Sequence, residues 1–374
     1  MIYLDYAATT PLDPEVRAAM EGVLEEYGNP SSIHQLGRRA RSLLEEGRER
    51  LARALGAKPR EVVLTAGGSE ADALALYGVA LARGRGHLVS TAVEHSAVLQ
   101  ALKNLERLGF EVTLLQPDRH GLIYPEQVAE ALRPATILVS VMAVNNELGT
   151  LYPVREIAEV CHARGVLLHT DAVQAMGTVP CQVETLGADL ISLAAHKFYG
   201  PKGVGALYVR KGVELFPIIP GKQEQGYRGG TENLPAVYGQ GLAAEKAVAR
   251  LAEESQRLLA LRSRLEARLL ALPGVMLNGH PTLRSPKHVN VTVMDADGEG
   301  LLLNLDLLGV AVSSGSACSS GSLEPSHVLL AIGRSREEAK ASVRFSLGRY
   351  TTEAEVDQAA QAFAEAVERS RVYT

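Results

Sequence analysis

Cysteine is scarce in this sequence, and its scarcity excludes two kinds of protein. The chain of 374 residues holds three cysteines and no tryptophan. Cys161, Cys181 and Cys318 are too few and too far apart for a disulfide framework or a Cys-x-x-Cys metal site. The histidines lack metal-ligand spacing as well. We therefore expect a protein of a reducing compartment, without a resident metal.

A basic excess and long apolar runs are also missing. The formal net charge is −5, which gives no positive footprint for nucleic acid. No apolar run reaches the length that spans a membrane. Residues 1–6 read as the start of a strand and lack the basic and apolar regions of a signal peptide. These absences predict a cytoplasmic protein with no membrane partner and no direct nucleic-acid partner.

What is present is the pattern of an α/β protein. Short apolar runs alternate with amphipathic stretches, which predicts a mostly parallel sheet with helices on both faces. The expected strands are 62–65, 87–90, 110–115, 136–142, 166–169 and 189–193, with helices over 96–108 and 154–164. The run 204–209 follows its predecessor after a turn too short for a crossover helix, so we expect it to be the one antiparallel strand.

After Gly239 the sequence pattern changes, which predicts a smaller α+β domain beside the large one. A chain of this length exceeds what one core usually holds. The predicted elements of this part are a long charged helix over 242–272, strands over 288–293 and 343–346, and a final helix from about 353. An early helix is expected over 13–26. The expected domains are residues 14–240, and residues 1–13 together with 241–374.

Chemically useful groups follow successive strands, at the edge of the sheet where α/β proteins bind ligands. Two glycines and a serine at 67–69 open a helix, as in a phosphate cradle or an ordinary helix cap. Turns and caps would equally explain the other groups one at a time. Those groups are His95, Asn145, Asp171, Gln174, His196 and Lys197.

Together these groups indicate pyridoxal 5′-phosphate. The phosphate of this cofactor needs helix N–H groups, its aldehyde needs a lysine, and its ring nitrogen needs a carboxylate. A lysine that closes an apolar strand is costly to bury as an ammonium. Lys197 is tolerated there if it is condensed with the aldehyde as a Schiff base, which requires a lowered pKa of the amine.

Eight ordered motifs resemble those of the cysteine desulfurases, in the class V aminotransferase group of fold-type-I pyridoxal-phosphate enzymes. The resemblance runs from about residue 2 to 350. The motifs are Leu4-Asp-Tyr-Ala-Ala-Thr-Thr-Pro11, Gly28-Asn-Pro-Ser-Ser32, Glu94-His95, Val144-Asn-Asn-Glu147, Asp171-Ala-Val-Gln174, His196-Lys-Phe-Tyr-Gly-Pro-Lys-Gly203, Arg228-Gly-Gly-Thr-Glu-Asn233 and Ser313-Ser-Gly-Ser-Ala-Cys-Ser319. The resemblance implies the fold-type-I transferase fold and conversion of L-cysteine to L-alanine with transfer of the sulfur.

The resemblance also implies a role for each matching residue. Lys197 would carry the cofactor and move the α-proton, His95 would stack on the ring and assist proton transfer, and Asp171 would pair with the ring nitrogen. The other implied cofactor contacts are Gln174 at the ring hydroxyl, Asn145 at the ring and the substrate, Gly68, Ser69 and His196 at the phosphate, and Thr231 from a partner subunit. Arg344 would bind the substrate carboxylate as a bidentate fork.

Cys318 is the residue that would define the reaction. It lies among serines and glycines, which predicts a mobile polar loop rather than the buried position that a structural cysteine prefers. Its thiolate would attack the substrate sulfur and keep it as a persulfide for an acceptor protein. Cys161, in a helical pattern, and Cys181, after a proline, are expected to be inert.

Three departures from the family pattern remove no catalytic group. Ala194 stands where many relatives have a serine that binds the phosphate, so one phosphate contact is expected to be missing. Gly68-Ser69 stands where Ala-Thr is common, and residues 220–224 depart from a glycine-richer pattern.

Other functions stay open at the level of sequence. An aminotransferase or a selenocysteine lyase on the same fold would use the same lysine, aspartate and histidine, although a transaminase has no use for a mobile thiol. A nucleotide-binding or scaffold protein would lack the covalent cofactor, and no dinucleotide fingerprint is found. The expected partners are a second copy of the chain in a homodimer, L-cysteine, and a sulfur acceptor such as an iron–sulfur scaffold or a thiolation protein.

Overall fold

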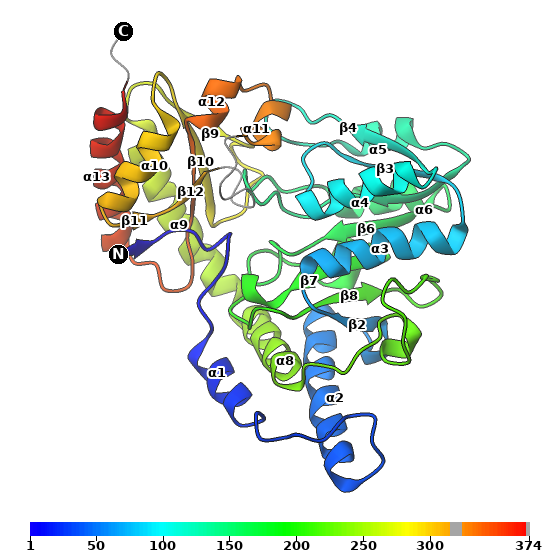
Figure 1. The fold of residues 1–374 in the computed structure, drawn as a ribbon. Coiled ribbons are helices and arrows are strands. Elements are labelled where there is room, and N and C mark those ends of the chain that lie inside the picture. The colour runs from blue at the N-terminus through cyan, green and yellow to red at the C-terminus, as the bar shows by residue number, and fades with distance from the viewer. Residues whose placement is uncertain (315–323, 372–374) are drawn as a thin grey trace.

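The computed structural model describes residues 1–314 and 324–371. In this part of the chain, a seven-stranded and a four-stranded sheet lie side by side, and each packs against apolar residues of its own (Figure 1). Helices α8 (Leu234–Ala249) and α9 (Leu251–Leu270) run from the larger unit to the smaller one. None of the described helices is long and apolar enough to cross a membrane.

The larger sheet has seven strands in the order β2-β8-β7-β6-β5-β3-β4. They are β2 (Val62–Thr65), β3 (His87–Thr91), β4 (Glu111–Leu115), β5 (Thr136–Ser140), β6 (Leu167–Asp171), β7 (Leu190–Ala194) and β8 (Gly205–Val209). β8 pairs antiparallel with β2 and β7, and the other neighbouring strands are parallel. The predicted fold class and the antiparallel strand are confirmed.

Helices cover both faces of the larger sheet, which is why most of its strands are apolar without alternation. α3 (Gly68–Arg83) and α4 (Ser96–Arg107) pack on one face. The other face and its surroundings hold α1 (Pro14–Glu21), α2 (Gln35–Leu55), α5 (Pro125–Ala131), α6 (Val154–His162), α7 (Val183–Leu186) and α8. Leu44 of α2 and Ile157 of α6 are fully buried on this side.

The smaller sheet has four strands in the order β12-β13-β10-β9, and neighbouring strands pair antiparallel. They are β9 (Val275–Asn278), β10 (His288–Val293), β12 (Ser313–Ser314) and β13 (Ser342–Ser346). Packed with them are α9, α10 (Gly298–Leu307), α13 (Glu353–Ser370) and the parallel pair β1 (Ile2–Tyr3) and β11 (Val310–Ala311). Short helical segments elsewhere are η1 (Pro59–Glu61), η3 (Glu224–Gly226), α11 (His327–Ala331) and α12 (Arg336–Lys340).

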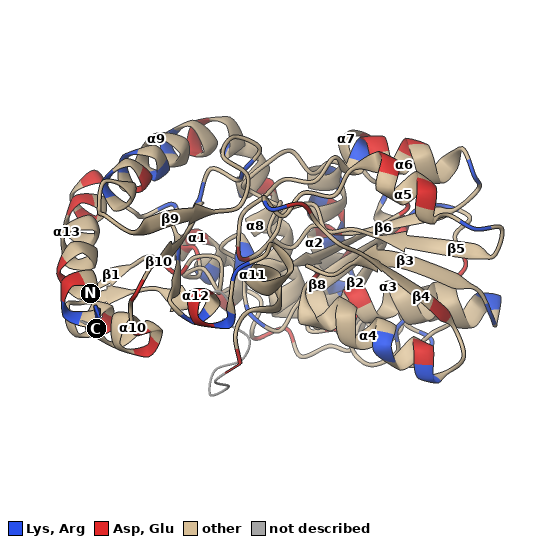
Figure 2. Cartoon of the chain, turned by 90° about the horizontal axis from the view of Figure 1, so that it is seen from above, with Lys and Arg blue, Asp and Glu red and all other residues tan. Residues whose placement is uncertain are grey.

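Charged side chains lie mainly on the outer helices. In Figure 2 both signs are interspersed along α9 and α13, whereas the strands of the two sheets are mostly uncharged. This view therefore shows no face dominated by one sign of charge, in keeping with the small net charge of the chain.

The prediction of one helix over 242–272 is wrong. α8 and α9 meet at Arg250, whose φ of −99° and ψ of −3° separate them. α8 packs so closely on α2 that a Cβ on Gly241 would lie 2.3 Å from the carbonyl oxygen of Gly47, whereas Leu261 of α9 joins the smaller core. The two helices serve different cores, but apolar residues recur on both sides of the break, so the sequence pattern concealed it.

The predicted domain boundary at residue 240 falls inside α8. Ala243 and Ala247, beyond that boundary, are buried in the core of the larger unit. The division into residues 14–240 and the remainder stays a prediction.

The N-terminal segment, residues 1–13, connects the two units. After β1, Asp5 forms a bridge with Ser346 of β13, and the N–H of Ala7 donates to Ser346 Oγ at 2.8 Å. The N–H of Thr10 then donates to the carbonyl of His196 in the larger unit at 2.9 Å. The segment therefore lies over the carboxyl end of β7, where the two units meet.

Candidate active site

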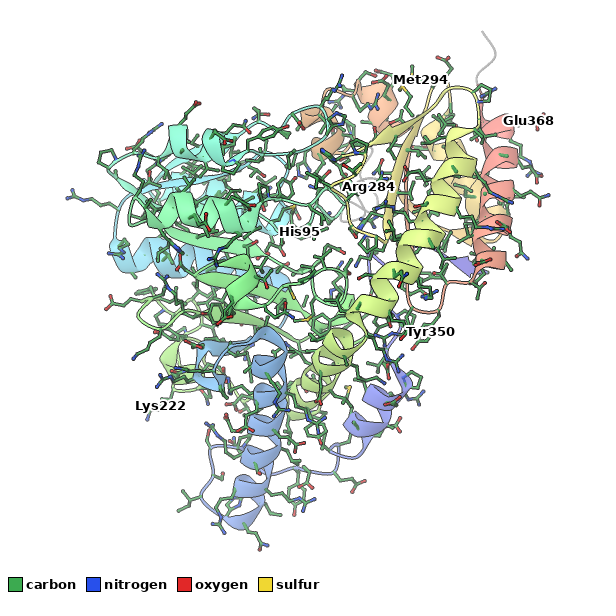
Figure 3. The ribbon with its side chains drawn as sticks, turned by 180° about the vertical axis from the view of Figure 1, so that it is seen from behind. His95, Lys222, Arg284, Met294, Tyr350 and Glu368 are labelled. Atoms are coloured by element: carbon green, nitrogen blue, oxygen red, sulfur yellow. The ribbon has the colours of Figure 1, made fainter. Side chains whose placement is uncertain are left out.

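A cavity of about 310 Å³ opens where the two units meet, at the carboxyl ends of the central strands. Its walls come from the N-terminal segment, the start of α3, the loops that follow β3, β5, β6 and β7, and one strand of the smaller sheet. His95, labelled in Figure 3, lies on the larger unit near its junction with the smaller one. The cavity is where the sequence predicted a ligand site.

Lys197 lines this cavity, at the end of η2 (Ala195–Lys197) and directly after β7. Its Nζ donates to the carbonyl oxygens of Ala7 and Ala8, each at 2.7 Å. The chain then turns through Tyr199, whose φ of 67° is left-handed, and returns as β8. The tight turn thus places a half-buried amine at the cavity, held by backbone acceptors.

Asp171 and Gln174 also line the cavity. Asp171 ends β6, is 6% exposed, and accepts a hydrogen bond from the N–H of Val173 at 2.9 Å. Burial, and then the neighbouring carboxylate of Asp72, raise the pKa of Asp171 to about 6. Gln174 Nε2 donates to the carbonyl of Ala7 at 2.8 Å, while its buried Oε1 has no hydrogen-bond partner in the described structure. Such an acceptor suits a donor group inside the cavity.

Two histidines bring neutral imidazole groups to the same place. His95 caps α4, and its Nδ1 accepts from the N–H of Ala97 at 3.2 Å, so the neutral ring carries its proton on Nε2. His196 Nδ1 lies 3.1 Å from Thr9 Oγ1. Burial, and then neighbouring lysine charges, lower the pKa of His196 to about 4. His196 is therefore a neutral hydrogen-bonding group at neutral pH.

The start of α3 has the geometry of an anion site. The helix begins at Gly68 after Gly67, and no side chain caps its first N–H groups. Gly68 and Ser69 line the cavity, so the positive end of the helix dipole lies there. A Cβ on Gly68 would lie 2.8 Å from Cγ2 of Val173, which leaves no room for a side chain. Ala194 lines the cavity too but has no hydroxyl to offer.

Arg344 reaches the cavity from β13 of the smaller sheet. It is 1% exposed. Its Nη1 donates to the carbonyl of Asn146 at 2.8 Å, and its Nη2 donates to Asp5 Oδ1 at 2.9 Å. Its buried Nε has no hydrogen-bond partner in the described structure. The guanidinium thus keeps a donor and lies opposite the groups of the larger unit.

The structure does not bring Asn145 to the cavity. Its side chain is fully buried, with Nδ2 donating to the carbonyl of Val93 and Oδ1 accepting from the N–H groups of Glu147 and Leu148. The amide therefore holds its own loop through Oδ1 and ties it to the loop after β3 through Nδ2. The next residue, Asn146, lines the cavity instead. The motif contains two adjacent asparagines, and only the conformation of the turn decides which one faces the cavity.

Two other predicted residues are not placed at the cavity. Thr231 is exposed on the surface of this chain, just before α8, and does not line the cavity. Cys318 lies outside the described residues. The last described residues before it, Ser313 and Ser314, pair with Arg344 and Val343 of β13, so the chain leaves the described structure beside the cavity.

Three features of the site were not predicted from the sequence. They are the carbonyl oxygens of Ala7 and Ala8, the side chain of Asp72, and the buried carboxyl of Glu94. The first two come from motifs already recognised, Leu4–Pro11 and the start of α3, but backbone acceptors and inward-facing helix positions have no signature in composition. Glu94 had a signal, because it is the acidic neighbour of His95.

Glu94 is a fully buried carboxyl beside the site. Its Oε1 accepts from Thr91 Oγ1 at 2.9 Å and from the N–H of Met142 at 3.1 Å, while its Oε2 has no partner in the described structure. Burial, reinforced by the neighbouring carboxylates of Asp171 and Asp72, raises the pKa of Glu94 to about 8. Glu94 is therefore protonated at neutral pH.

We expect Glu94→Gln to reduce the pH dependence of stability. Between about pH 5 and about pH 8, Glu94 keeps its proton in the folded protein but has already lost it in the unfolded chain. Unfolding therefore releases a proton, and the free energy of unfolding falls as pH rises through this window. The amide cannot ionise. The free energy of unfolding of the variant should exceed that of the wild type by about 4 kcal/mol at pH 8 and by much less at pH 5. Urea titrations at both pH values measure this, and an equal difference at both would contradict it.

The groups at the cavity fit pyridoxal 5′-phosphate. An uncapped helix start matches a phosphate, Lys197 matches an aldehyde, and Asp171 matches a ring nitrogen. The unpartnered Oε1 of Gln174 matches the phenolic hydroxyl of the ring, which is a donor. Each functional group of the cofactor thus has a complementary residue on the cavity wall.

Comparison with known proteins agrees with this fit. The family model described as Aminotransferase class-V matches residues 2–359. Cysteine desulfurase IscS of Dictyoglomus turgidum is 47% identical over 99% of this chain and 95% of its own length, and that of Methanosarcina thermophila is 46% identical over 99% and 93%. Among solved structures, a NifS-like protein has a TM-score of 0.92 at 36% identity, covering 98% of this chain and 99% of its own. A NifS-like protein from Rickettsia africae has a TM-score of 0.90 at 30% identity, with the same coverage.

Proposed function

Because the chain belongs to the aminotransferase class-V family and is a pyridoxal-phosphate-dependent cysteine desulfurase, we propose that Cys318 receives the sulfur of L-cysteine as a persulfide and passes it to an acceptor protein. The observation that supports this most is the convergence of Lys197, Asp171 and Arg344 on one cavity. An amine, a carboxyl and a guanidinium so arranged can hold the cofactor and an amino-acid substrate together.

Each cavity residue has a task in this proposal. Bound pyridoxal phosphate supplies an electron sink for the α-carbon of the substrate. Lys197 would carry the cofactor, and once displaced by the substrate its Nζ would take the α-proton. Asp171 would hold a proton on the ring nitrogen, and Gln174 would accept a hydrogen bond from the ring hydroxyl. His95 would cover the ring and relay a proton through Nε2.

The phosphate would be held by Gly68, Ser69 and His196. All three line the cavity, and the neutral imidazole of His196 can donate a hydrogen bond without adding charge. Asn145 would act indirectly, because its amide fixes the loop from which Asn146 reaches the cavity.

Arg344 would bind the carboxylate of the substrate. Its guanidinium already holds one carboxylate, that of Asp5, and its Nε retains a free donor in the described structure. Arg344→Lys keeps the charge but loses the planar fork, so the KM for L-cysteine should rise more than kcat falls. A loss confined to kcat would contradict this role.

Cys318 would supply the sulfur-transfer step. Its thiolate would attack the substrate sulfur, so that an S–S bond forms as the Cβ–S bond breaks. The electron pair of the broken bond goes to Cβ, which takes up the proton given up by the substrate thiol, and alanine results. The sulfur remains on Cys318 as a persulfide, and no oxidant is needed. Cys161 and Cys181 are buried, and burial raises the pKa of both thiols to about 12, so neither supplies a thiolate at neutral pH.

Mass spectrometry of the protein after incubation with L-cysteine tests the proposal. The peptide that contains Cys318 should gain one sulfur atom, and an equivalent of alanine should form for each persulfide. The peptides of Cys161 and Cys181 should stay unmodified, which makes them internal controls. Alanine formed without any sulfur on the Cys318 peptide would overturn the proposal.

We further propose that the protein is a cytoplasmic homodimer. Thr231 is exposed and does not line the cavity of its own chain, so its hydroxyl is available to the phosphate of a partner subunit. Leu24, Tyr27 and Ile33, between α1 and α2, are 64%, 83% and 90% exposed, and a second copy would cover such apolar side chains. Sedimentation at micromolar concentration should give twice the mass of the chain, and a monomer that retains full activity would refute the dimer.

The protein that accepts the sulfur from Cys318 would be an iron–sulfur scaffold or a thiolation protein.

A further inference from the structure

A row of buried polar side chains crosses the larger sheet on the face that α3 covers. Ser90 Oγ donates to the carbonyl of Ser140 at 2.7 Å, and Ser140 Oγ lies 2.8 Å from His169 Nδ1. His169 Nε2 lies 2.9 Å from Ser192 Oγ. All four residues are at most 1% exposed. Burying polar side chains in an apolar layer costs free energy unless they are hydrogen-bonded. We therefore expect a functional role for this network at the end where it meets the cavity.

The row ends at Asp72, which lies one helical turn after Gly68 on α3. Asp72 Oδ1 lies 3.5 Å from His169 Nε2, an ion-pair distance longer than a normal hydrogen bond. This oxygen is buried and has no hydrogen-bond partner in the described structure, and the side chain is 1% exposed. Asp72 nevertheless lines the cavity together with Asp171. A buried carboxylate with an unfilled acceptor at a cavity wall is suited to a ligand that brings a donor or a positive charge.

We propose that Asp72 is a second acidic group for the cofactor ring, which acts with Asp171 to favour a protonated ring nitrogen and is oriented by His169. This proposal rests on the proposed function and deepens it. His169 and Asp171 are two residues apart on β6, so their side chains point to the same face of the sheet. This is the face that α3, with Asp72, covers. The two carboxyls therefore reach the cavity from two elements and from one side.

Charge explains what the second acid adds. Two neighbouring carboxylates repel each other, and the influence of Asp72 on the pKa of Asp171 shows that they are close enough to interact. A positive ring nitrogen between or beside them relieves that repulsion. In this arrangement Ser140 Oγ donates to Nδ1 of His169, which leaves its Nε2–H directed to Ser192 and Asp72. His169 is then a positioning residue, since it acts through Asp72.

The test compares two cofactors in apo-protein titrations of Asp72→Asn. One is pyridoxal 5′-phosphate, and the other is its 1-deaza analogue, in which carbon replaces the ring nitrogen. We expect the affinity for pyridoxal phosphate to fall about tenfold while the affinity for the analogue stays the same. His169→Gln should change the ratio of the two affinities in the same direction by a smaller factor. Because the ratio is measured within one variant, a general loss of stability does not alter it.

Asp189→Asn is the matched control. Asp189 is another fully buried aspartate of the larger sheet, and it lies 3.0 Å from a histidine nitrogen, that of His162, but does not line the cavity. This variant should melt at a lower temperature with an unchanged affinity ratio. Equal losses for both cofactors in Asp72→Asn, or no loss for either, would overturn the proposal. A wild type that binds neither cofactor would instead refute the proposed function.

Discussion

Lys197→Ala is expected to yield a colourless protein with no measurable desulfurase activity, a loss of at least about 10³-fold. In the proposed mechanism Lys197 both carries the cofactor and takes the α-proton, so the variant should lose both functions. Lys197 is half-buried, and its Nζ donates to the backbone carbonyls of Ala7 and Ala8 rather than packing in an apolar core, so the fold should survive its replacement. Absorption spectroscopy after incubation with pyridoxal phosphate, followed by an alanine assay, measures both losses.

Lys202→Ala is the matched control for this experiment. Lys202 lies in the same turn after β7, but it is exposed and does not line the cavity. This variant should bind the cofactor and turn over as the wild type does. A Lys197→Ala protein that stays coloured after dialysis would show that another amine carries the cofactor.

Cys318→Ala is expected to separate cofactor binding from sulfur transfer. The variant should bind pyridoxal phosphate with the colour and affinity of the wild type, because every predicted cofactor contact remains. Persulfide formation and sulfide release should fall by about 10³-fold, since the attacking thiolate is gone. Absorption at saturating cofactor and a sulfide assay with L-cysteine give the two readings.

Cys161→Ala and Cys181→Ala control for the loss of a thiol as such. Both residues are buried, with pKa values raised to about 12 by burial, so their replacement should lower stability and leave sulfur transfer intact. Undiminished sulfide release by Cys318→Ala would favour an aminotransferase-like side reaction over a persulfide mechanism.

The sequence predicted the larger sheet well because its strands are buried on both faces. β2 to β8 fall within a few residues of the predicted runs, since most of these runs are apolar and fully buried, β4 with its exposed Glu111 being the exception. The misses are strands β9 and β12 of the smaller sheet and several features of the helices. α2 was not predicted, because its buried face is made of leucine, alanine and glycine between many arginines and glutamates. The break at Arg250 was missed because helical periodicity reports which residues are buried and not which core they are buried in.

The site was predictable where a residue type carries the chemistry. Lys197, Asp171, Gln174, Arg344 and the two histidines meet at one cavity because each ends a strand or a turn at the same edge of a sheet or faces that edge. Asn145 and Asn146 show the limit: neighbours of the same type differ in role only through the turn that holds them. Asp72 was missed because a polar residue within a helix pattern reads as a solvent-facing position.

Through the N-terminal segment, the position of Lys197 at the cavity depends on residues near the C-terminus. Ala7, whose carbonyl holds the amine of Lys197, is itself held by Ser346, 339 positions later. The ribosome releases the first of these residues long before it makes the second, and domains fold progressively during synthesis. A nascent chain therefore lacks the complete cavity until β13 has emerged, and the cofactor can meet that cavity only in a chain that already contains Arg344.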